Sequence, residues 1–264
     1  MHKFYSQNGE DFLLWSLFEN LKKPGFFVEV GALDGIRFSN TYFFESKDWK
    51  GICIEPQPEY FKLLSKNRPN SYCFEGAASN ENGYIDFYAD KNGDFSTLIN
   101  SNAERAKAKN KVEDYKKIIV PINRLDEILE KAKAPVPIEF VSIDVEGAEQ
   151  LVLEGFDISH YKPRVLIVEA NDAKSNQIID QYMKKYGYFK AGRLKENNFY
   201  CRTFTDLIRL SLIPLKCSTI YPPHPLNPRE GINDSWRTKH FNEGSFAKNN
   251  FKKFVKRIFN RFKG

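Results

Sequence analysis

Short apolar runs, each ending on or followed by a glycine or a carboxylate, recur along the first two thirds of this sequence. They are four to six residues long, alternate with stretches of helical apolar spacing, and lie at 26–30, 51–55, 71–76, 138–143 and 165–168. Strands that are apolar on both faces are typical of parallel sheets, because helices cover both sides of such sheets. The alternation therefore predicts a doubly wound, mostly parallel α/β sheet.

The remaining segments complete this arrangement. We expect a leading helix, helices between the strands and a polar helix or lid, at 12–21, 56–66, 101–117, 125–129, from about 147, and at 175–186. Further strands are expected at 118–122 and at 84–88, where alternating polarity indicates an edge position. The last two runs, 188–193 and 199–203, predict an antiparallel hairpin that closes a seven-stranded, Rossmann-like sheet.

A glycine pair follows the first predicted strand. Gly31 and Gly35 are flanked by Glu29 and Asp34, at the carboxyl edge where open α/β sheets bind ligands. A dinucleotide fingerprint requires G-x-G-x-x-G, and only G-x-x-x-G is present here. Two carboxylates would also repel a pyrophosphate, whereas they suit a ligand that carries an ammonium and a sulfonium. The pair indicates a cofactor turn without a dinucleotide, although an ordinary strand-to-helix turn has the same pattern.

Carboxylates stand at the ends of three further strands. Glu55 ends the second strand about 20 residues after Gly35, where a carboxylate can accept both hydroxyls of an adenosine ribose. Asp144 and Glu146 follow the strand at 138–143, and Glu169 follows the next one. Acids at the end of a buried strand are costly unless they are paired, hydrogen-bonded or bound to a cation. These acids are candidates for chemistry, with helix capping as the alternative.

A metal site is a second possibility at the same edge. Asp144, Glu169 and Asn171 carry oxygen atoms of the type that Mg²⁺ prefers. Because parallel strands end at one edge of a sheet, the three side chains are expected to converge. Mg²⁺ is therefore a possible cofactor.

Five stretches of this sequence together have a recognisable order and spacing. They are VEVGALDGIRFSNT (28–41), CIEPQPEYF (53–61), GAAS (76–79), LDEIL (125–129) and SIDVEGAE (142–149). In this combination, over about residues 6–170, the chain resembles the FkbM family of methyltransferases. The resemblance implies a Rossmann-like enzyme that uses S-adenosylmethionine, bound over the glycine turn with its ribose on Glu55.

The resemblance also implies where the cofactor makes its contacts. Adenine is expected near 76–78, and an N-terminal motif at 6–11, SQNGED, is similar to that of a subgroup in which it folds over the cofactor. The residues implied as cofactor contacts are Gln7, Glu29, Gly31, Ala32, Asp34, Asn40, Thr41, Glu55, Pro56, Ala77, Ala78 and Asp144.

The expected reaction is O-methylation of a sugar hydroxyl in a glycan or glycoconjugate, because similar proteins often methylate sugars. Asp144 and Glu146 are predicted to be catalytic, since the hydroxyl proton needs an acceptor in the transition state. The histidine that some sugar methyltransferases carry shortly after this aspartate is absent, as Gly147 and Ala148 follow. Methylation of a nitrogen or a carboxyl group remains an alternative, as does a non-catalytic scaffold that docks on membranes.

The net charge of +6 is concentrated at the C-terminus. Seven of the 40 basic residues and none of the 34 acidic residues lie in the last twenty positions. The body is therefore nearly neutral, which makes nucleic acid an improbable partner. In the segment 247–264, apolar residues recur with helical spacing between the cations. This pattern predicts a basic amphipathic helix that either contacts a membrane surface or docks on the body.

The expected organisation has four parts. They are an N-terminal helix or cofactor lid (1–24), the methyltransferase domain (25–205), an irregular proline-rich extension (206–246) and the basic helix (247–264). The four cysteines form no C-x-x-C pair, and no run of about 18 apolar residues or apolar leader is present. We therefore expect a cytoplasmic protein with free thiols, and peripheral membrane contact through 247–264 is the alternative to a fully dissolved one.

Overall fold

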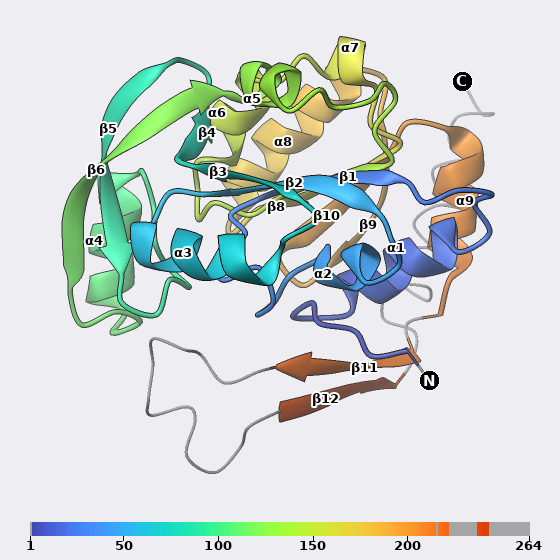
Figure 1. Cartoon of the computed structure of the whole chain (residues 1–264), viewed down its shortest axis with the longest axis horizontal. Coiled ribbons are helices and arrows are strands. Elements are labelled where there is room, and N and C mark those ends of the chain that lie inside the picture. Colours follow the sequence, from blue (N-terminus) through green and yellow to red (C-terminus); the bar gives the residue numbers. More distant parts are fainter. Residues whose placement is uncertain (1, 215, 222–236, 243–264) are drawn as a thin grey trace.

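The computed structural model describes residues 2–214, 216–221 and 237–242. Its centre is a seven-stranded sheet (Figure 1). The strands, in spatial order, are β3 (Tyr72–Glu75), β2 (Lys50–Glu55), β1 (Phe26–Val30), β7 (Phe140–Ile143), β8 (Val165–Glu169), β10 (Asn197–Cys201) and β9 (Phe189–Leu194). The first five are parallel, and β10 is antiparallel to both of its neighbours. The predicted fold class and the closing hairpin are confirmed.

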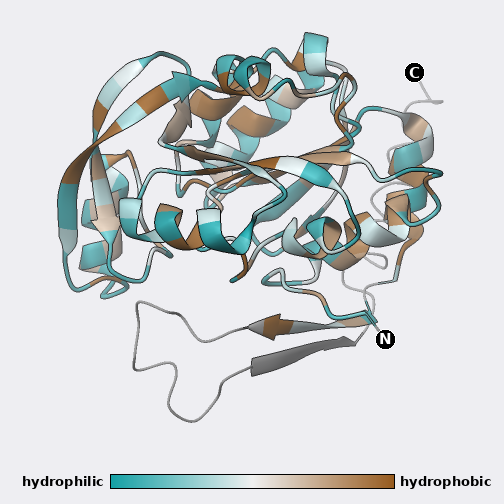
Figure 2. Ribbon diagram, in the orientation of Figure 1, coloured by the Kyte–Doolittle hydropathy of each residue, from teal (hydrophilic) through white to brown (hydrophobic). Residues whose placement is uncertain are grey.

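Helices cover both faces of this sheet (Figure 1). One layer contains α1 (Glu10–Phe18), α2 (Tyr42–Glu45), α3 (Pro58–Asn67) and α9 (Phe204–Leu212), and the other contains α5 (Leu125–Lys131), α6 (Glu149–Glu154), α7 (Ile158–Tyr161) and α8 (Ala173–Lys185). Successive residues of a strand point to opposite faces, so Phe27 of β1 packs in the first core and Val28 in the second. Figure 2 shows hydrophobic residues concentrated in the sheet and on the helices beside it.

A second, three-stranded sheet was not foreseen. It consists of β4 (Ala77–Ser79), β6 (Tyr115–Arg124) and β5 (Gly83–Asp90), with α4 (Asn100–Ala108) inserted between β5 and β6. The expected edge strand at 84–88 is confirmed as an edge strand, but it belongs to this second sheet and not to the main one, because it pairs with β6. Phe87, Val120 and Ile122 bury one face of this small sheet in a core of its own.

The segment 206–246 was expected to be irregular, and this is wrong for its described part. Helix α9 continues into it because Leu207 and Leu210 lie one turn apart and pack into the first core, and Thr203 caps its N-terminus. Strands β11 (Lys216–Tyr221) and β12 (Arg237–Asn242) then form an antiparallel ribbon. The predicted basic helix at 247–264 lies outside the described residues. None of the described helices is both long and apolar enough to cross a membrane.

Candidate active site

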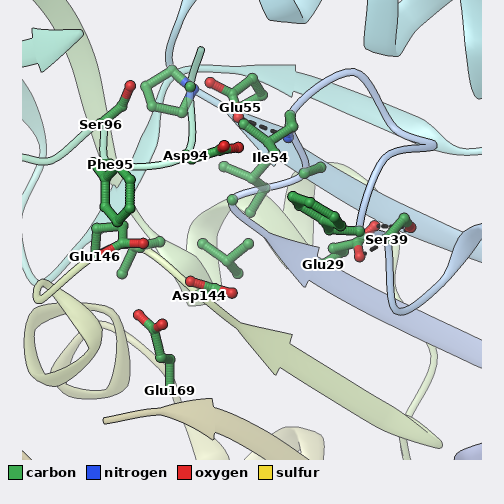
Figure 3. A pocket seen from close by; sticks show the side chains of 18 of the residues that line it. Glu29, Ser39, Ile54, Glu55, Asp94, Phe95, Ser96, Asp144, Glu146 and Glu169 are labelled. Atoms are coloured by element: carbon green, nitrogen blue, oxygen red, sulfur yellow. Dashed lines mark hydrogen bonds between the residues drawn. The ribbon is translucent and has the colours of Figure 1, made fainter. Parts of the chain in front are cut away.

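A cleft of about 380 Å³ lies at the carboxyl ends of the parallel strands. It is lined by the residues that follow or end β1, β2, β7 and β8, together with the start of the antiparallel β10. Strand order reverses between β1 and β7, since β1 is followed in the chain by β2 on one side and flanked by β7 on the other. Open α/β sheets bind ligands at such a switch point. Figure 3 shows the cleft from close by.

The turn after β1 requires glycine. Gly31 has φ +86°, and a Cβ atom there would lie 1.9 Å from the backbone oxygen of Asp144. The amides of Gly31 and Ala32 both donate to the backbone oxygen of Ile54, at 3.0 Å each. The chain can therefore turn sharply against β2 and β7 only without a side chain at position 31, and Gly31 itself lines the cleft.

Glu55 lies at the end of β2 with its carboxylate in the cleft (Figure 3). One carboxylate oxygen accepts the amide of Leu33 at 2.9 Å and the other accepts the amide of Gln57 at 2.8 Å. Burial raises the pKa of Glu55 to about 7, against these two hydrogen bonds, which lower it. Each oxygen retains a lone pair, so the oriented carboxylate can accept two hydroxyls of a ribose.

Glu29 also lines the cleft, but its carboxylate has protein partners. It accepts hydrogen bonds from Ser39 Oγ at 2.8 Å, the Asn40 amide at 2.7 Å and Thr41 Oγ1 at 2.6 Å. The buried guanidinium of Arg68 lies 3.4 Å away. Glu29 therefore holds the 39–41 turn in place, and Asn40 of this turn lines the cleft.

Two other predicted cofactor contacts have a supporting position. Asp34 and Thr41 are absent from the cleft lining. Asp34 Oδ1 accepts the amides of Ile36 and Arg37 at 2.8 Å each, so this side chain stabilises the loop after the glycine turn. The remaining predicted contacts all line the cleft: Gln7, Gly31, Ala32, Asn40, Glu55, Pro56, Ala77, Ala78 and Asp144.

Three carboxylates meet in the middle of the cleft. Oxygen atoms of Asp144, Glu146 and Glu169 all lie within 4.8 Å of one another, and Figure 3 shows the three side chains turned towards each other. Glu146 reaches this position from a left-handed turn with φ +52°, followed by Gly147. The side chain of Glu149 accepts the amides of Val145 and Gly147, which stabilises that turn.

Burial separates the charge states of these carboxylates. Loss of solvent raises the pKa of Asp144, of Glu146 and, most strongly, of Glu169, and their mutual repulsion raises the latter two further. A hydrogen bond between Asp144 and Glu169 lowers the pKa of Asp144 and raises that of Glu169. Burial thus favours a state in which Asp144 and Glu169 share one proton over a state in which both are ionised.

The predicted metal ligand Asn171 reaches the same cluster with its nitrogen. Asn171 Nδ2 donates to Glu169 at 2.9 Å and to Glu146 at 3.3 Å. The oxygen ligands that converge are thus those of Asp144, Glu146 and Glu169 rather than the trio expected from the sequence.

Several wall residues had no recognisable signal in the sequence. The loop at 93–96 forms one wall, where Asp94 pairs with Arg37 across the cleft and Ser96 Oγ donates to Gln57. On the opposite side, Glu10 and Asn197 line the cleft. Polar residues are common in turns and at helix starts for local reasons such as capping. Only the tertiary structure shows that these residues line the cleft.

The fold and the cleft define a class of protein. A Rossmann-like sheet, a glycine turn without a phosphate fingerprint, and a buried carboxylate with free lone pairs at the end of β2 fit S-adenosylmethionine and are typical of methyltransferases that use it. The chain belongs to the FkbM methyltransferase family, since the model of the methyltransferase FkbM domain matches residues 29–190. It is thus an S-adenosylmethionine-dependent methyltransferase, which confirms the prediction of an enzyme over that of a non-catalytic scaffold.

Several solved structures with a similar chain course are described as methyltransferases. They include a precorrin-6y C5,15-methyltransferase from Geobacter metallireducens (10% identity, 90% of this chain and 85% of that chain, TM-score 0.41). Another is a putative RNA methyltransferase from Pyrococcus horikoshii (10% identity, 88% of this chain and 80% of that chain, TM-score 0.39). A third is a TehB-like methyltransferase from Corynebacterium glutamicum (5% identity, 75% of this chain and 89% of that chain, TM-score 0.43). No curated protein sequence matches the chain significantly. The family assignment therefore rests on the domain match.

Proposed function

We propose that this methyltransferase transfers the methyl group to a hydroxyl oxygen of a sugar. The observation that carries the proposal is the position of Asp144. It follows β7, between the turn after β1 and Glu169 of β8, and its carboxylate lies in the cleft (Figure 3). A carboxylate here can take the proton of an attacking hydroxyl.

Bound S-adenosylmethionine supplies an electrophilic methyl group on a positively charged sulfur. The acceptor oxygen forms the new C–O bond while the S–C bond breaks, and its proton passes to Asp144. The hydrogen bond between Asp144 and Glu169 orients the Asp144 carboxylate. Gly31 and Ala32 line the same cleft, so a cofactor bound over this turn lies close to these groups.

The lining beyond Asp144 supports a sugar as the acceptor. It consists of side chains that can form hydrogen bonds: Gln7, Glu10, Glu169, Asn171, Glu196 and Asn197. A carboxyl acceptor would be repelled by the acidic cluster, which argues against carboxyl methylation. An amine acceptor is compatible with the charge, so methylation of sugars and of amines must be compared directly.

Binding of Mg²⁺ is a second role that the carboxylates of Asp144, Glu146 and Glu169 could serve. Three converging oxygen ligands are a suitable partial set for Mg²⁺, which also lowers the pKa of a bound hydroxyl. Turnover measured after EDTA treatment and after addition of Mg²⁺ tests this role. Full turnover in EDTA would exclude a metal role and would leave a carboxylate as the acceptor of the hydroxyl proton.

The first experiment is calorimetric titration with S-adenosylhomocysteine. Glu55→Ala is expected to weaken binding at least tenfold, about 1.4 kcal/mol, because the ribose loses its carboxylate. The matched control is Glu75→Ala, since Glu75 is paired with Glu55 in register on β3 but is exposed and outside the cleft lining. Equal binding by Glu55→Ala and the wild type would refute the placement of the cofactor. Methyl transfer from labelled S-adenosylmethionine to glycosides, amines and carboxylates then tests the acceptor.

The basic segment at 247–264 suggests a location for this activity. We propose a cytoplasmic enzyme that contacts anionic membrane lipid through this segment, which would suit lipid-linked or glycoconjugate acceptors. Co-sedimentation of the full chain, but not of a chain lacking 247–264, with phosphatidylserine vesicles is expected. Equal sedimentation of the two chains would contradict this proposal.

A further inference from the structure

The cleft has a second half, beyond Asp144, that the cofactor does not need. Along the sheet edge the order is Glu55 of β2, the turn after β1, Asp144 after β7, Glu169 of β8 and Asn197 of β10. Neighbouring strands are about 4.8 Å apart, so Asn197 lies about 14 Å along the edge from β1. A cofactor with its ribose on Glu55 lies over β2 and β1, and the edge of β8 and β10 is left for the acceptor.

Asn197 presents an unpaired oxygen in this half. Its side chain is only 6% exposed and lines the cleft. Asn197 Nδ2 donates to Glu10 Oε1 at 3.0 Å, whereas Oδ1 is buried and has no hydrogen-bond partner in the described part of the chain. Because a carboxylate accepts and does not donate, Glu10 fixes which end of the amide faces it. Buried carbonyl oxygens are normally satisfied, so a donor from a ligand would complete this one.

Glu10 adds negative charge that the protein does not neutralise here. It is fully buried and accepts hydrogen bonds from the amide and side chain of Asn8 as well as from Asn197. Among the described residues, no ion pair joins Glu10, Glu169 or Glu196 to a lysine or arginine. This half of the cleft thus accepts hydrogen bonds and repels anions.

Given the proposed sugar methylation, on which this step rests, we infer that Asn197 recognises a second hydroxyl of the acceptor sugar. Glu10 orients the amide so that Oδ1 accepts the hydrogen bond of that hydroxyl. The enzyme therefore selects neutral sugars with a second free hydroxyl over sugars that carry a carboxylate. The N-terminal segment, through Glu10, acts as part of the acceptor site and not only as a cover for the cofactor.

The test uses methyl glycosides as acceptors with labelled S-adenosylmethionine. Neutral hexosides, their hexuronide counterparts and their monodeoxy derivatives are compared on the wild type. We expect at least tenfold higher kcat/KM for the neutral hexoside than for its hexuronide. The monodeoxy derivative that lacks the recognised hydroxyl should have a kcat/KM at least tenfold lower than the neutral hexoside on the wild type. Asn197→Ala should not lower the kcat/KM of this derivative further.

A matched variant separates recognition from folding. Asn197→Ala is expected to raise KM for the neutral hexoside at least tenfold and to leave the affinity for S-adenosylhomocysteine unchanged. Asn198→Ala is the control, because Asn198 is the next residue of β10, is also buried, has its own unpaired Oδ1 among the described residues and does not line the cleft. This control should retain the KM of the wild type.

The possible outcomes distinguish the inference from the proposed function. Equal turnover of hexoside and hexuronide, or an unchanged KM in Asn197→Ala, would overturn the inference and leave sugar methylation standing. If Asn197→Ala does not bind S-adenosylhomocysteine, the variant is misfolded. The hexuronide and monodeoxy comparisons on the wild type then decide whether the inference holds. Methylation of no glycoside by a protein that binds S-adenosylhomocysteine would overturn both.

Discussion

Removal of the buried charge of Arg68 should destabilise the enzyme strongly. Arg68 is fully buried, with Nε 2.7 Å from Glu45 and Nη1 3.4 Å from Glu29. Methionine has a similar length, so Arg68→Met removes the charge while keeping much of the packing. Breaking a buried ion pair from one side costs about 3–5 kcal/mol, because the partner carboxylates stay buried without compensation. For a domain of this size that corresponds to a fall in Tm of about 6–20 °C.

The assay is thermal unfolding followed by circular dichroism, with S-adenosylhomocysteine titration as a second readout. Binding should also weaken, since Glu29 holds the 39–41 turn beside the cleft. Addition of Glu45→Gln to Arg68→Met should recover part of the lost stability, because it removes one uncompensated charge. The control is Arg105→Met, whose exposed side chain pairs with Asp172 at 3.6 Å and should contribute less than about 1 kcal/mol. A shift in Arg68→Met no larger than in this control would refute the reasoning.

Three further predictions concern the cleft. Gly31→Ala should weaken S-adenosylhomocysteine binding more than about 100-fold, a loss of some 2.7 kcal/mol, because its Cβ would lie 1.9 Å from the Asp144 oxygen; an unchanged Kd in calorimetry would contradict the turn geometry. Asp144→Asn should lower kcat by about 10²–10⁴ with cofactor binding retained, and near-normal turnover would exclude it as the proton acceptor. Burial raises the pKa of Glu146 from 4.5 to about 9, so the folded state binds the Glu146 proton more tightly than the unfolded state does. The free energy of unfolding therefore falls as the pH rises from 4.5 to about 9. Glu146→Gln should therefore have a higher Tm than the metal-free wild type at pH 8, with the difference vanishing near pH 4, and equal Tm values at pH 8 would count against the burial of this charge.

The mostly parallel main sheet, its closing hairpin and the strand ends that line the cleft were predictable from the sequence. Each buried strand is a short apolar run, and the residue types that follow it, Gly31, Glu55 and Asp144, are those that a turn or a ligand requires at that edge. Local patterning suffices here because parallel strands must end at one edge. The second sheet could not be predicted in this way, because the pairing of β5 with β6 across α4 depends on contacts distant in the chain.

The sequence by itself thus determined the fold class and the family, and indicated which strand ends line the cleft. Only the tertiary structure decided the roles of individual polar residues. Glu29 and Glu55 are both glutamates of buried strands that line the cleft. Arg68 and the 39–41 turn bind the carboxylate of Glu29, whereas within the described residues the carboxylate of Glu55 accepts only two backbone amides. Glu10 and Asn197 meet although 187 positions separate them. Burial and hydrogen-bond partners assign such roles, and both are set by residues that only folding brings together.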